Sequence, residues 1–235
     1  MRNRIFITLL LLALTAAAVS VKAQINDAND AIDRGNGFFH RGQYGLAIFE
    51  YKSALNWPGG HQARARFNIG VCKHKLGRLR EALAEYRAAI KLREGQYPLA
   101  FYALGVALQD LRRYPEAREA FAQAVKSSGG KHAEALFELA LESQRAGDDR
   151  AAVEHYRRAV AQSKDNIPAC HNNLGVILAR AGLLEEAERE FETAVKRSGG
   201  KFAEASQNLA RLRQMLDGAS PGIIAGMKTP GIKAE

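Results

Sequence analysis

A period of 35 residues runs through most of this chain and limits what it can fold into. Two alanine series repeat at this interval, an always-aromatic series lies between them, and a fourth series is always Gly or Ala. The series are Ala47, Ala82, Ala117, Ala152 and Ala187; Ala54, Ala89, Ala124, Ala159 and Ala194; Tyr51, Tyr86, Phe121, Tyr156 and Phe191; and Gly35, Gly70, Gly105, Ala140, Gly175 and Ala210. Self-similarity at a fixed period indicates a repeat architecture, here with five copies and a final partial one.

Each copy has the pattern of two helices. The alanine, aromatic and alanine positions stand at i, i+4 and i+7, so they form one stripe along a helix. The small position belongs to an earlier helix, and glycines such as Gly42 and Gly77 separate the two. Small residues let two helices approach closely, and we expect the aromatic side chains to fill the space between successive copies. The sequence therefore predicts an all-α fold of stacked helix pairs.

The segments at residues 35–55 and 173–195 carry these positions in register and resemble tetratricopeptide repeats. The resemblance implies a right-handed solenoid of helix-turn-helix units over residues 28–216, with repeats starting near residues 28, 63, 98, 133 and 168 and a C-terminal capping helix at 201–216. The period is one residue longer than the usual 34 of this family. Arg34 and Asp149 occupy places that are normally apolar, so we expect the first and fourth repeats to pack less tightly.

Both ends of the chain differ from the repeats. Residues 1–23 combine Arg2 and Arg4 with an apolar run at 5–19 and a small-residue cleavage site, which is typical of a secretory signal peptide. The alternative is an uncleaved anchor, but this run is shorter than the roughly 20 residues that span a bilayer. We expect an exported protein, periplasmic or secreted, with no transmembrane domain after cleavage. Residues 217–235 contain four Gly and two Pro and predict a flexible tail.

Two stretches, SGGKHAEA at 128–135 and SGGKFAEA at 198–205, raise the question of a phosphate-binding loop. Such a loop needs a preceding strand and a Ser or Thr after the lysine. Here a helix precedes the glycines, and His132 and Phe202 follow the lysines. We interpret these glycines as residues that end a helix.

The sequence offers little to catalysis or metal binding. Its six histidines form no H-E-x-x-H motif and no closed Cys/His ligand set. His40 and His74 are expected near the ends of neighbouring first helices, but two ligands without a third rarely hold a metal. Cys72 and Cys170 lie almost three repeats apart, which predicts two buried thiols rather than a disulfide. We therefore predict a protein that is not an enzyme and that has no metal or cofactor.

Positive charge is concentrated in one segment. The formal net charge is +9, and residues 61–95 hold nine Lys or Arg against three Glu. A basic patch attracts polyanions of any kind. Because we expect export, an anionic envelope polymer is a possible partner, and no nucleic acid is expected.

In a helical-repeat solenoid the first helices line a concave surface. Phe67, Tyr102 and Phe137 predict an aromatic ladder there, since aromatic residues recur at binding hot spots, although they can equally pack against the neighbouring helix. The resemblance implies that asparagines on this face hydrogen-bond a peptide backbone. The predicted partner-binding groove comprises Asn36, Phe39, Phe67, Asn68, Val71, His74, Tyr102, Val106, Phe137, Leu141 and Asn173.

These features favour a non-catalytic interaction scaffold of a bacterial cell envelope that binds a peptide or partner protein in this groove. The alternative is an envelope protein attached to an anionic polymer through the basic second repeat. A third possibility, an enzyme of unrecognised type, predicts turnover that no residue set in the sequence suggests.

Overall fold

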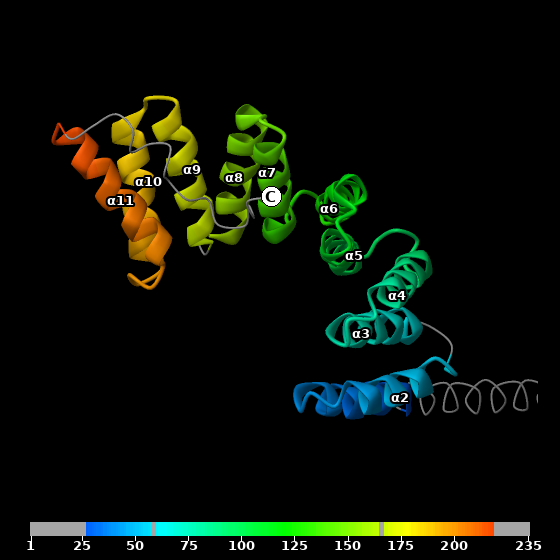
Figure 1. Cartoon of the computed structure of the whole chain (residues 1–235). Coiled ribbons are helices and arrows are strands. Elements are labelled where there is room, and N and C mark those ends of the chain that lie inside the picture. The colour runs from blue at the N-terminus through cyan, green and yellow to red at the C-terminus, as the bar shows by residue number, and fades with distance from the viewer. Residues whose placement is uncertain (1–26, 58–59, 165–166, 219–235) are drawn as a thin grey trace, which may run out of the picture. The chain divides into compact units, whose positions relative to one another are not determined.

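Helices account for most of the chain in the computed structural model, which describes residues 27–57, 60–164 and 167–218 (Figure 1). After a helical segment at residues 27–40, the helices are α2 (Tyr44–Ala54), α3 (His61–Lys75), α4 (Leu79–Leu92), α5 (Pro98–Asp110), α6 (Tyr114–Ser127), α7 (Ala133–Arg145), α8 (Asp149–Ser163), α9 (Pro168–Arg180), α10 (Leu184–Arg197) and α11 (Ala203–Leu216). The predicted all-α fold of helix pairs with a closing C-terminal helix is confirmed. The predicted signal peptide at 1–23 and most of the predicted tail, from residue 219 onward, lie outside the described residues.

The chain divides into two compact units, Met1–Ala117 and Arg118–Glu235, here called unit 1 and unit 2. In unit 1, consecutive helices pack from α2 to α5. In unit 2, they pack from α7 to α11, and α11 contacts both α9 and α10. Periodicity alone does not show this division, because the 35-residue interval continues through it.

Small and aromatic positions meet inside each helix pair. A methyl group added to Gly70 would lie 2.6 Å from the Tyr86 ring, and one added to Gly175 would lie 2.7 Å from the Phe191 ring. The aromatic side chain therefore packs against the backbone of the first helix in its own repeat, and not only between successive repeats as expected. All five aromatic positions are at most 2% exposed, and both alanine series are fully buried. Burying one large apolar side chain contributes about 1.5–3 kcal/mol, so this recurring contact is the core of the fold.

The turn inside each pair contains a residue in the left-handed region. Gly77 has φ 73° and Gly147 has φ 76°, a conformation that glycine adopts without strain. The third repeat has Arg112 at this place with φ 57°, where a side chain costs about 1–2 kcal/mol. At the junction after α6, Gly129 and Gly130 have φ 65° and 83°, as expected of glycines that end a helix.

Both cysteines are free thiols in the interior. Cys72 lies in α3 of unit 1 and Cys170 in α9 of unit 2, and each is fully buried. Burial raises the pKa of Cys72 to about 11 and that of Cys170 to about 12. The expectation of two buried thiols is met, and neither thiol has the lowered pKa of a reactive cysteine. No helix in the described ranges is long and apolar enough to cross a membrane.

Candidate partner-binding surfaces

In unit 1 the predicted groove residues lie on three first helices, namely the segment at 27–40, α3 and α5. All of them are half-buried; they are Asn36, Phe39, Phe67, Asn68, Val71, His74, Tyr102 and Val106. We call this set the unit 1 surface. Part of each side chain is held by the fold and part faces solvent, which is the condition for a preorganised contact surface.

Two asparagines of the unit 1 surface are joined across repeats. Asn68 Nδ2 donates a hydrogen bond to Asn36 Oδ1 at 3.4 Å, and the Tyr51 hydroxyl donates to the same oxygen at 2.9 Å. Tyr51 is one of the recurring aromatic residues that close a helix pair, so packing in the core also fixes the amide of Asn36. The side-chain amides of Asn36 and Asn68 are therefore held in a fixed orientation in the absence of a partner.

Phe67 lies among other rings and still keeps an exposed part. Its ring centroid is 5.9 Å from that of Tyr86 and 5.4 Å from that of Tyr97. The guanidinium of Arg93 lies over the Tyr97 ring, 5.5 Å from its centroid. Offset aromatic contacts of this kind stabilise a side chain beyond its buried area. Phe67 thus packs against its neighbours, as one interpretation of the sequence held, while its outer part remains available to a partner.

His74 connects two first helices instead of facing another histidine. Its Nε2 lies 2.7 Å from Asp110 Oδ2, which joins α3 to α5. His40 instead packs edge-on against Phe39, with ring centroids 5.9 Å apart. No group of three or more His, Cys, Asp or Glu side chains suited to a metal ion occurs in the part of the chain that the structure describes.

In unit 2 the predicted groove residues are less accessible. Phe137 is half-buried, with its ring 5.8 Å from that of Tyr156. Leu141 is 2% exposed and Asn173 is fully buried. Of these three residues, only Phe137 is therefore partly open to solvent. A partner-binding role for the predicted residues in either unit stays a prediction.

A chain of buried hydrogen bonds runs through unit 2 from α7 to α11. The Tyr156 hydroxyl donates to Gln144 Oε1 at 3.0 Å and accepts from Asn173 Nδ2 at 2.9 Å. Asn172 Nδ2 donates to Asn173 Oδ1 at 3.1 Å, and Asn208 Nδ2 donates to Asn172 Oδ1 at 2.9 Å. Sequence reasoning treated Asn173 as a peptide contact and did not find this network. The sequence feature that could have indicated it is the presence of Asn and Gln close to the small-residue positions of α7, α9 and α11.

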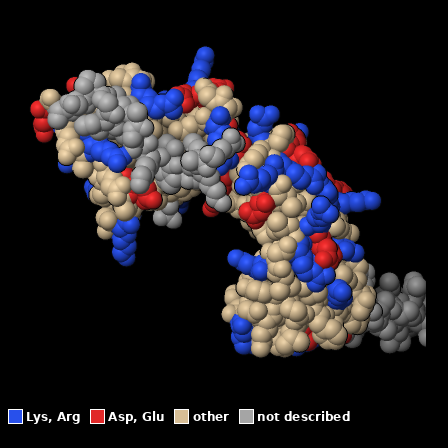
Figure 2. All heavy atoms as spheres, in the orientation of Figure 1, with Lys and Arg blue, Asp and Glu red and all other residues tan. Residues whose placement is uncertain are grey.

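The basic second repeat is partly neutralised within unit 1. Glu85 lies 2.9 Å from both Arg66 and Lys73, and Glu81 lies 2.6 Å from Arg78. Figure 2 shows Lys and Arg gathered with Asp and Glu among them over the part that holds α4. Five exposed cations of this repeat have no carboxylate partner among the described residues: Arg64, Lys75, Arg80, Lys91 and Arg93. The second repeat therefore keeps positive charge that its own carboxylates do not neutralise.

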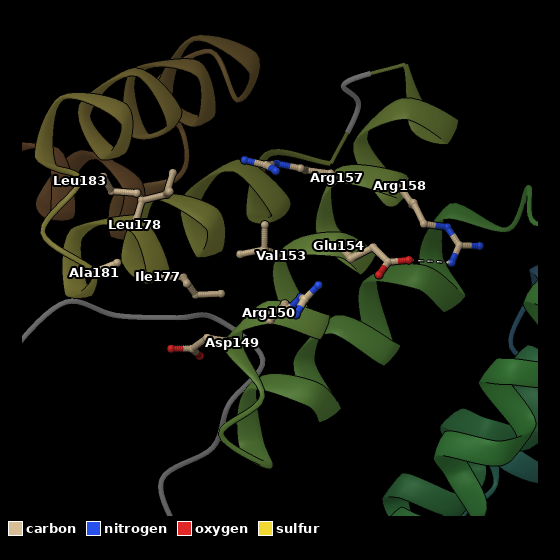
Figure 3. A pocket seen from close by; sticks show the side chains of 10 residues that line it. All are labelled: Asp149, Arg150, Val153, Glu154, Arg157, Arg158, Ile177, Leu178, Ala181 and Leu183. Carbon is tan, nitrogen blue, oxygen red and sulfur yellow. Dashed lines mark ion pairs between the residues drawn. The ribbon is translucent and has the colours of Figure 1, made fainter.

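A cleft of about 590 Å³ opens in unit 2 between α8 and the α9–α10 pair (Figure 3). The sequence analysis did not predict it. Its lining comprises Asp149, Arg150, Val153, Glu154, Arg157, Arg158, Ile177, Leu178, Ala181 and Leu183. Apolar side chains form its floor and charged side chains its rim.

Comparison with protein families gives matches described as "Tetratricopeptide repeat" at residues 63–96, 102–167 and 141–202. Together these matches cover more than half of the 235 residues. Among curated protein sequences, none matches this chain.

Several solved structures have a similar fold. PilF of Pseudomonas aeruginosa aligns with a TM-score of 0.71 and 18% identity over 87% of this chain and 90% of its own. A crystal structure of MamA aligns with a TM-score of 0.60 and 22% identity over 71% of this chain and 95% of its own. YrrB, described as a TPR protein with an unusual peptide-binding site, aligns with a TM-score of 0.59 and 21% identity over 75% and 88%. At these identities the similarity establishes the fold alone.

Proposed function

The chain belongs to the tetratricopeptide repeat family, and we propose that it is a non-catalytic adaptor of a bacterial cell envelope that holds a peptide segment or partner protein against the unit 1 surface. Stacked helical repeats are scaffolds for protein interaction, since successive first helices create an extended surface. YrrB, a protein of similar fold, is described as having an unusual peptide-binding site, which supports the same class of function for this chain.

The observation that carries the proposal is the half-buried Phe67 beside the joined amides of Asn36 and Asn68. An aromatic side chain supplies a large contact area and has few rotatable bonds to immobilise. Amide groups offer both donors and acceptors, which is what an extended peptide backbone needs. A surface with these two parts fits a peptide segment better than a small charged ligand.

Capture of a partner from an envelope extract tests this proposal. The double variant Phe67→Ala and Tyr102→Ala removes two half-buried aromatic rings from the unit 1 surface. The matched control is Leu46→Ala with Phe49→Ala, because these α2 side chains are 50% and 68% exposed and lie outside the predicted set. We expect capture by the wild type and the control and loss of capture by the Phe67/Tyr102 variant. Equal capture by all three chains overturns the proposed surface.

The envelope location rests on the composition of residues 1–23, which matches a secretory signal peptide. Cell fractionation followed by N-terminal sequencing tests it. A mature protein that begins at Gln24 in the periplasmic or secreted fraction is the expected result. A chain that keeps Met1 and remains in the cytoplasm contradicts export.

The exposed cations of the second repeat favour a second candidate function, attachment to an anionic envelope polymer. Arg64, Lys75, Arg80 and Lys91 have no carboxylate partner among the described residues. Electrostatic attachment of exposed charges weakens as salt rises, since the screening length falls to about 3 Å at 1 M. Capture that disappears between 0.05 and 1 M salt (roughly the range over which screening becomes complete) and is insensitive to Phe67→Ala identifies this alternative.

A further inference from the structure

The fourth repeat differs from the others at the first residue of its second helix. The equivalent positions in the other repeats are large and apolar: Tyr44, Leu79, Tyr114 and Leu184. Tyr44 and Leu184 each pack against a buried core cluster. Asp149 instead directs Oδ2 toward the Arg180 guanidinium, 3.7 Å away, and lines the cleft of unit 2. The fourth repeat therefore has a smaller, charged side chain at a position that is large and apolar in the other repeats.

The floor of the cleft is apolar and accessible from outside. Val153 of α8 faces Ile177 and Leu178 of α9, and Leu183 lies at the edge with 47% of its surface exposed (Figure 3). The cleft has a volume of about 590 Å³ and is open to solvent. This floor can therefore accept an apolar side chain from outside the chain.

Two arginines on the rim have no acidic partner in the described part of the molecule. Arg150 and Arg157 are seven residues apart, which places them two helical turns or about 10 Å apart on the face of α8 that carries Val153. Figure 3 shows them on either side of Val153. The other rim charges are matched, since Arg158 lies 3.8 Å from Glu154 and Arg180 lies 3.7 Å from Asp149.

The fifth repeat shows which side chains can pair with charges at these three positions of a second helix. In α10 the positions equivalent to Arg150, Val153 and Arg157 are Glu185, Glu188 and Glu192. The position equivalent to Leu178 is Arg213 of α11, whose Nε donates to Glu188 at 2.7 Å and whose other nitrogen pairs with Glu192. At that junction the chain supplies both signs of charge itself. At the α8 junction it supplies only the arginines and an apolar floor.

We propose that this cleft binds an acidic helical segment of a partner protein. Two neighbouring apolar side chains of the segment lie on Val153, Ile177 and Leu178, and two carboxylates two turns apart pair with Arg150 and Arg157. Arginine pairs with carboxylates in fixed, bidentate geometry, so the spacing of the two carboxylates provides specificity. This site is distinct from the unit 1 surface and gives the scaffold a second point of attachment.

A synthetic peptide tests the proposal with the full chain. The probe is a fluorescent alanine-based helical peptide with Glu at positions i and i+7 and Leu at i+3 and i+4, and binding is followed by anisotropy. Arg150→Glu with Arg157→Glu is expected to weaken binding by at least about tenfold, because both rim contacts become repulsive. Arg118→Glu with Arg189→Glu makes the same change in net charge at two exposed arginines outside the cleft and is expected to bind like the wild type. Equal helical circular dichroism confirms that both variants are folded.

A second variant closes the cleft without altering its arginines. Asp149→Leu restores the residue type found at Leu79 and Leu184, so it is expected to abolish peptide binding without lowering the melting temperature. A peptide with Leu→Ala is expected to bind weakly, because the apolar contact is lost. The proposal is overturned if the wild-type chain does not bind the peptide, if Arg150→Glu with Arg157→Glu leaves binding unchanged, or if the Leu→Ala peptide binds equally well. The last result identifies a general polyanion patch.

Discussion

Asn173 donates a hydrogen bond to the hydroxyl of Tyr156 over 2.9 Å, and both residues are fully buried. The same hydroxyl donates to Gln144, so one oxygen joins three helices of unit 2. Removing it deprives Gln144 Oε1 and Asn173 Nδ2 of this hydrogen bond in the interior. We expect Tyr156→Phe to lower the free energy of unfolding by about 1–3 kcal/mol.

Urea denaturation followed by circular dichroism measures this change. Tyr86→Phe is the matched control, because Tyr86 occupies the same place in the second repeat and its hydroxyl makes no hydrogen bond among the described residues. An equal loss of stability in both variants would show that the network in unit 2 contributes nothing of its own.

Gly70→Ala tests the close contact inside the helix pairs. The new methyl group would lie 2.6 Å from the Tyr86 ring, so the ring or the helix has to move. Overpacking of this kind typically costs about 1–3 kcal/mol. Gly45→Ala in α2 is the control, since a methyl group there meets nothing within 4 Å, and we expect it to stabilise the chain by about 0.4–1 kcal/mol. Thermal melts of the two variants should shift in opposite directions, and a Gly70→Ala chain as stable as the wild type contradicts this account.

The recurrence of Gly70 and Tyr86 at fixed positions could be predicted, because a repeat places the same residue types at the same position in every copy. The close packing of the Tyr86 ring on Gly70 inside one repeat was not predicted, since the sequence analysis placed the aromatic side chains between successive copies. The bonds of Asn173 and the pair formed by His74 and Asp110 could not be predicted, because their partners lie in other helices and periodicity does not specify side-chain direction. The departure of Asp149 from the apolar pattern was visible and predicted looser packing in the fourth repeat. The cleft that lies beside Asp149 and the arginines of α8 could be recognised only in the structure.

The two cysteines report on the two units separately. Cys72 in unit 1 and Cys170 in unit 2 are fully buried, and burial raises the pKa of each thiol. Labelling with a thiol reagent should therefore be slow in the native protein and complete in denaturant, because both accessibility and the thiolate fraction are low. In the single variants Cys72→Ala and Cys170→Ala, the labelling rate of the remaining thiol reports how readily its own unit opens. Rapid labelling of either thiol under native conditions would contradict the burial described above.

The stability of unit 2 should fall as the solution is acidified. Burial lowers the pKa of His132 below its ordinary value of 6.5, despite the nearby Glu134 carboxylate, and His155 is shifted in the same direction, also mainly by burial. Neutral His132 caps α7, since its Nδ1 accepts a hydrogen bond from the Ala135 amide at 3.3 Å. Below pH 6.5 the unfolded chain binds more protons at these histidines than the folded chain does, so the free energy of unfolding decreases with falling pH.

The variant His132→Asn tests the source of this dependence. Asparagine is also a favourable N-cap residue but does not titrate. We expect the variant to lose less stability than the wild type between pH 7 and pH 5 (about the range in which a histidine changes charge), as followed by labelling of Cys170 in increasing urea. An unchanged pH dependence would exclude His132 as its source.

Site-specific photo-crosslinking is the most direct test of the central claim that the unit 1 surface holds a partner. A photoreactive amino acid at Val71, which lies half-buried on that surface, is compared with the same group at Phe49, which is 68% exposed on α2. The account predicts one discrete crosslinked partner from Val71, lost on Phe67→Ala, and none from Phe49. Crosslinks from Phe49 alone, or from neither position in cells where the chain is captured with a partner, would contradict it.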